Sequence, residues 1–118
     1  MNNNLPVNEI ASDIAGLGIP GLLLLIAIEA TGLSGGAAIV AALVALGPGG
    51  MVGGILFLVA SGLLAQAIAQ YSIQEILVAV VRELLRQGYT KESLKKQVSK
   101  YWVSNNLKYR LYEVIDKS

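Results

Sequence analysis

The stretch Thr31–Gly54 reads TGLSGGAAIVAALVALGPGGMVGG, and its pattern decides the fold. Small residues alternate with Ile, Val and Leu, which indicates helices without a polar face. The segment Gly47-Pro48-Gly49-Gly50 interrupts them, because proline ends helices and glycine tolerates positive φ. We therefore expect a hydrophobic helical hairpin, with arms at residues 33–47 and 51–70 and a tip at residues 47–50.

Helical signals continue on the N-terminal side of this stretch. Val7 to Gly16 can form a short helix, and Ile19 to Ala30 predicts a helix that is buried all round. Pro20 suits its first turn and Gly32 suits its C-cap. Ser34 is the expected N-cap of the next helix.

On the C-terminal side the pattern becomes amphipathic. Ser72 and Glu75 match a capping box, and apolar residues then recur at helical spacing until Gly88. Thr90 predicts the cap of another helix, and Asn105 or Asn106 that of a last one. The apolar side of the first of these helices would hold Leu94, Val98, Tyr101 and Trp102, and that of the last Leu107, Leu111, Val114 and Ile115.

The whole chain is therefore predicted to be all-α, a Gly/Ala-rich hydrophobic hairpin followed by a small basic helical unit. Its 118 residues suffice for one domain. Three segments are expected: a polar lead-in with a short helix at 1–18, an apolar helical region at 19–70 and an amphipathic and basic unit at 71–118.

The glycines of the apolar region have two interpretations. Pairs spaced as GxxxG let helix backbones approach closely in lipid, whereas glycines beside proline serve a turn. Both remain open for the residues of interest, which are Gly32, Gly36, Gly47, Pro48, Gly49, Gly50, Gly53 and Gly54.

Charge is distributed unevenly along the chain. No residue from Ala30 to Gln74 is charged, and all nine cations lie at or after Arg82. Such asymmetry suggests contact with a membrane or a nucleic acid. Lipid contact, a solvated face and nucleic-acid binding are the three interpretations of the cations, and nucleic acid is the least favoured. A solvated face and lipid contact are weighed about equally, and on the lipid interpretation the contacting residues would be Lys91, Lys95, Lys96, Lys100 and Trp102.

The length of the apolar runs tests whether they span a membrane. A span needs about 20 apolar residues. Met51 to Ala69 is long enough, but the runs at Ile19–Ala30 and Ser34–Leu46 are short. A hairpin could enter a bilayer or lie buried in a soluble bundle. If it enters, the positive-inside rule places the C-terminus in the cytoplasm.

Enzymatic chemistry has little support in the sequence. The chain has no cysteine and no histidine, and its glycine-rich turn lacks the Lys-Ser/Thr of a P-loop. We expect no catalytic residue, cofactor or metal. Glu29 is the charge within the apolar region: it is either a proton- or ion-sensing carboxylate or, as we favour, a helix-end residue that reaches solvent.

Thr31–Gly54 resembles two kinds of membrane-active protein. One is the hydrophobic hairpin of colicin-type pore-forming bacteriocins, and the other is the Gly/Ala-rich core of small interferon-inducible membrane proteins and their bacterial look-alikes. The resemblance implies conditional membrane insertion and a role in permeability or cell death. The chain departs from colicins because it lacks the large amphipathic bundle that shields their hairpin.

Two functions follow as expectations. The first is a small membrane-active helical protein, a bacterial toxin or permeabilising effector that self-associates in a membrane. The second is a soluble cytoplasmic all-α oligomer that buries the apolar region in its core and binds a protein partner.

Overall fold

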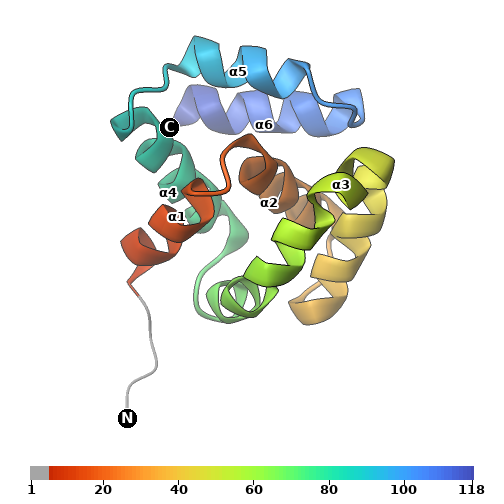
Figure 1. Ribbon diagram of the computed structural model, residues 1–118. Coiled ribbons are helices and arrows are strands. Elements are labelled where there is room, and N and C mark those ends of the chain that lie inside the picture. The colour runs from red at the N-terminus through yellow and green to blue at the C-terminus, as the bar shows by residue number, and fades with distance from the viewer. Residues whose placement is uncertain (1–5) are drawn as a thin grey trace.

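A computed structural model describes residues 6–118, apart from residues 47–61, and this part of the chain is all-helical, as predicted (Figure 1). The elements in chain order are α1 (Val7–Ala15), α2 (Ile19–Thr31), α3 (Gly35–Gln70), α4 (Ile73–Arg86), α5 (Lys91–Ser99) and α6 (Asn105–Lys117).

Helix α2 lies at the centre of the fold and contacts each of the other helices. All of its side chains from Leu22 to Ile28 are buried, which confirms the prediction from its uniformly apolar sequence. Pro20 occupies the first turn, and Gly32 ends the helix in the left-handed conformation with φ of 67°. This helix is therefore buried by protein on all sides.

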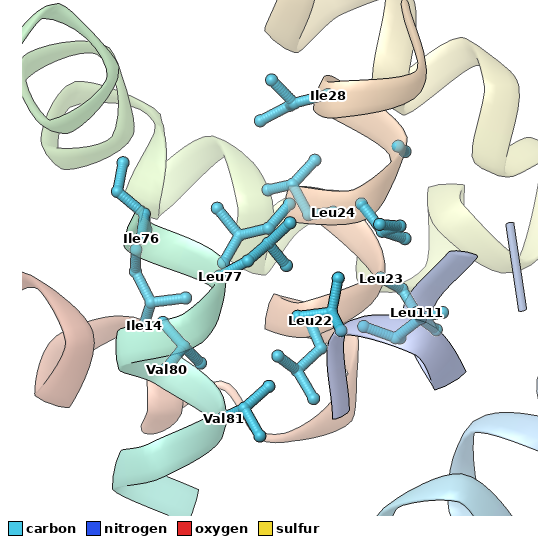
Figure 2. Close-up of a cluster of buried hydrophobic side chains, with 14 of the residues drawn as sticks. Ile14, Leu22, Leu23, Leu24, Ile28, Ile76, Leu77, Val80, Val81 and Leu111 are labelled. Atoms are coloured by element: carbon cyan, nitrogen blue, oxygen red, sulfur yellow. The ribbon is translucent and has the colours of Figure 1, made fainter. Parts of the chain in front are cut away.

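The hydrophobic core joins α2 to helices distant in sequence. Figure 2 shows Leu22 and Leu24 of α2 close to Leu77 and Val81 of α4. The labelled cluster also includes Ile14 of α1 and Leu111 of α6, and both are almost fully buried. Burial of each such side chain contributes about 1.5–3 kcal/mol. Described residues of all three predicted segments, 1–18, 19–70 and 71–118, thus share one core.

The two described ends of helix α3 lie close together. Gly35 at its start and Ile68 near its end line the same shallow pocket of about 290 Å³. A straight helix of 36 residues would instead be about 54 Å long, and the longest dimension of the molecule is 43 Å. The described parts at residues 35–46 and 62–70 therefore form two arms, as the hairpin prediction requires. The predicted tip at residues 47–50 lies outside the described residues.

Local capping signals place α4 and α5. The Ser72 hydroxyl accepts a hydrogen bond from the Glu75 amide at 3.1 Å, and the Glu75 carboxylate accepts one from the Ser72 amide at 3.3 Å. The Thr90 hydroxyl caps α5 by accepting from the Ser93 amide. Both predicted caps are confirmed.

Two predictions for the C-terminal helices are wrong. Ser104, not Asn105 or Asn106, caps α6, because its hydroxyl accepts from the Leu107 amide and Asn105 is already helical. Tyr101 and Trp102 do not continue the apolar side of α5. That helix ends at Ser99, so its register no longer directs them toward the core.

Candidate functional site

The outer face of the first arm of α3 is exposed and carries no charge. Val40 and Val44 of this arm expose 63% and 75% of their surface, and Leu33, which directly precedes the N-cap of α3, exposes 55%. Ala37 is also exposed. The opposite side of the arm is buried, at Ala38, Ile39, Ala42 and Leu46. A helix on the surface of a soluble domain usually presents polar residues to water. We call the set Leu33, Ala37, Val40 and Val44 the apolar stripe.

An exposed aromatic group lies at the end of this stripe. Trp102, in the connection between α5 and α6, exposes 92% of its surface. A shallow pocket of about 530 Å³ joins this connection to α3, and its lining includes Trp102, Lys100 and Ala45. Figure 1 shows the connection next to α3. The apolar stripe and Trp102 are therefore parts of one region of the surface.

A hydrogen bond and a partly buried side chain fix the connection between α5 and α6. The Lys108 ammonium donates to the carbonyl of Ser99 at 3.0 Å, across the gap between α5 and α6. Val103 packs against the hydrophobic core, and its neighbour Trp102 points into solvent. We call Lys96, Lys100, Tyr101, Trp102 and Lys108 the Trp102 corner.

The lysines expected to contact lipid fall into two pairs. Lys91 donates to the Asp116 carbonyl at 3.1 Å, and Lys95 forms an ion pair with the Asp116 carboxylate at 2.7 Å. Lys96 and Lys100 are exposed and make no side-chain hydrogen bond or ion pair within the described part of the chain. The first pair is thus occupied by α6, and the second is available to a ligand.

Glu29 takes part in a contact that the sequence does not reveal. Its carboxylate accepts from the Arg110 guanidinium at 3.0 Å and from the Gln74 amide at 3.2 Å. The Glu29 side chain is 22% exposed. The favoured interpretation, a helix-end carboxylate that reaches solvent, did not include these two partners. No local sequence pattern indicates either partner, because Gln74 and Arg110 lie 45 and 81 residues away in the chain. The contact ties α6 and α4 to the end of α2.

The glycines singled out from the sequence have different roles where the structure describes them. Gly32 is the left-handed C-cap of α2. A Cβ atom on Gly36 would meet no described atom within 4 Å, so no described backbone uses this glycine for close approach. Gly47, Pro48, Gly49, Gly50, Gly53 and Gly54 lie outside the described residues.

Two other features of the described residues bear on possible sites: a groove between α1 and α4, and the placement of the acidic side chains. A groove of about 820 Å³ runs between α1 and α4, with Val78 and Leu85 in its lining and Arg82 and Arg86 among its polar groups. Arg86 is paired with Glu83. Among the residues that the structure describes, no three acidic side chains gather where they could hold a metal ion.

A helix that spans a membrane must be both long and apolar. Within residues 6–46 and 62–118, no single helix is both long and apolar enough to cross a bilayer. Two sharply bent pairs meet these requirements together: α1 with α2, bent by 120°, and residues 62–70 with α4, bent by 116°.

The chain matches no protein-family model, no curated protein and no solved structure. The resemblance to colicin-type hairpins and to small interferon-inducible membrane proteins thus rests on the composition of residues 31–54.

Proposed function

We propose that this protein acts at membranes, as a small helical toxin or permeabilising effector of bacterial type that self-associates in the bilayer. It would contact the bilayer first through the apolar stripe, and residues 33–70 would then enter as a hairpin. The C-terminal helices would stay on the cytoplasmic side, because their cations follow the positive-inside rule.

The observation that carries this proposal is the exposed, uncharged outer face of α3. Contiguous exposed apolar surface on a small protein marks a site of contact with a membrane or another protein. Transfer of the partly exposed side chains of Leu33, Val40 and Val44 out of water would contribute roughly 1 kcal/mol each. The uncharged sequence continues from the stripe to Gln74, so insertion of the hairpin would carry no charge into the bilayer.

Vesicle co-sedimentation and dye leakage test the proposal. We expect the wild type to sediment with vesicles and to release a trapped dye. The double variant V40N/V44N should lose both activities, because it places two amides on the stripe. Valine and asparagine have similar helix propensity, so α3 should be retained.

The control variant V40A/V44A keeps the stripe apolar and should still sediment with vesicles. Circular dichroism should show the same helix content for all three proteins. A wild type that neither sediments with vesicles nor releases dye would overturn the proposal.

A soluble oligomeric interaction module is the second candidate. It is favoured by α2, which is apolar on all sides yet buried by protein. In that case a second copy or a partner would cover the apolar stripe. Size-exclusion chromatography without detergent separates the two functions, because the module would elute as a discrete oligomer and V40N/V44N would convert it to a monomer.

A further inference from the structure

We infer that the Trp102 corner is a docking site for the anionic headgroups of a membrane. This inference rests on the proposed membrane function and adds to it the lipid class and the side chains that select it. In this arrangement the corner contacts the headgroups while the apolar stripe contacts the bilayer.

The charges around the corner favour an anionic partner. Residues 93–112 contain five cations and no carboxylate. Arg110 and Lys95 are paired with Glu29 and Asp116, but Lys96 and Lys100 have no carboxylate partner in the described structure. Lys108 is bound to a neutral carbonyl, which leaves its charge uncompensated. Three positive charges therefore gather at one end of the α5–α6 pair.

The aromatic groups favour a membrane as the source of the anions. Trp102 is 92% exposed and Tyr101 39%, at the point where the cations gather. Tryptophan and tyrosine prefer the headgroup level of a bilayer, where the ring can leave water while its N–H or O–H stays hydrated. An exposed indole beside unpaired lysines thus matches an anionic membrane surface in both charge and polarity.

The position of the corner relative to α3 makes simultaneous contact possible. Ala45, the residue after the last member of the apolar stripe, lines the same pocket as Lys100 and Trp102. Lys100, the indole and the end of the stripe are therefore adjacent on the surface. Lys91 and Lys95 of α5 are instead bound to Asp116 of α6.

Helix α5 offers a matched pair of variants for the test. K96Q/K100Q and K91Q/K95Q each remove two lysines spaced four residues apart from the same helix. The first pair belongs to the corner, whereas the second is bound to α6. Each cation near an anionic membrane contributes about 1 kcal/mol. We therefore expect K96Q/K100Q to bind anionic vesicles roughly 30-fold more weakly, and K91Q/K95Q to bind them within about threefold of wild type.

The experiment uses the full chain and two kinds of vesicle, one of pure phosphatidylcholine and one containing an equal part of phosphatidylglycerol. Trp102 is the only tryptophan in the sequence, so its emission should shift to the blue when the corner docks. We expect the anionic vesicles to bind more tightly and this preference to disappear in K96Q/K100Q or at high salt. Circular dichroism and a urea unfolding curve should confirm that both variants fold.

The outcomes separate this inference from the proposed function. Equal binding of wild type to both vesicles, or equal losses in the two lysine variants, overturns the docking site but leaves membrane contact intact. Binding to neither vesicle overturns both. If duplex DNA binds instead and K96Q/K100Q abolishes that binding, the cations serve a nucleic acid and the inference fails.

Discussion

At the scale of single residues, Glu29 shows how context changes a side chain's role. In sequence it is a solitary charge near the end of an apolar helix. In the fold it joins three helices, since Arg110 of α6 and Gln74 of α4 both donate to it. No periodicity or capping rule connects residues so far apart, so this contact could not be predicted. The side chain of Arg110 is 45% exposed, and such a pair contributes modestly to stability.

Gly21 is a second residue whose role depends on its neighbours. A Cβ atom at this position would lie 2.8 Å from the carbonyl oxygen of Ile14, a backbone atom of the end of α1. We expect G21A to lower the free energy of unfolding by about 1–3 kcal/mol, because α1 would have to move away from α2. Urea unfolding followed by circular dichroism measures the effect.

Gly36 provides the control for Gly21. It is also helical, but an added Cβ would meet no described atom within 4 Å. G36A should therefore leave the protein as stable as wild type or stabilise it by up to about 1 kcal/mol, the helix-propensity gain of alanine over glycine. Equal effects of G21A and G36A would contradict the close packing of α1 on α2.

At the scale of elements, the sequence was most informative where the signal is local. The helices at residues 7–15, 19–31 and 73–86 were predicted within one or two residues, because proline, glycine and capping boxes act within one turn. The errors came at the α5–α6 connection. A helical period predicts which side is apolar, but it does not show that α5 stops at Ser99 and leaves Trp102 exposed.

Two serine N-caps offer a comparison between elements. Ser72 accepts a hydrogen bond from the Glu75 amide, whereas Ser34 makes no side-chain capping bond. S72A should therefore destabilise the protein by about 1 kcal/mol, and S34A by only a few tenths. Thermal and urea unfolding of both variants would check this, and a larger effect for S34A would show that the caps are assigned incorrectly.

At the scale of the whole molecule, the candidate site is formed by segments that are separate in the chain. The composition of residues 31–54 predicted an apolar helix, and the lysines predicted a basic unit. Sequence could not show that the end of the first α3 arm and the α5–α6 connection share one pocket, because this proximity depends on how both pack against α2. The sequence also could not show that Lys91 and Lys95 contact Asp116 whereas Lys96 and Lys100 have no carboxylate partner in the described structure.

The exposure of Trp102 predicts a property of the whole particle. In dilute solution without lipid, acrylamide should quench its emission almost as well as it does in the urea-unfolded chain, because 92% of the residue is accessible. Strong protection in the folded protein would show that another copy covers the corner. Sizing at the same concentration would then give the number of copies.

The uniform burial of α2 has a consequence for synthesis. Residues 19–31 leave the ribosome well before Leu111 of α6, which packs against them in the finished core (Figure 2). At about 5–20 residues per second, a helix with no polar side is without its final cover for several seconds. We therefore expect a chaperone or a membrane surface to cover the apolar surface of α2 in the nascent chain. This cover can be released only after α6 has been synthesised.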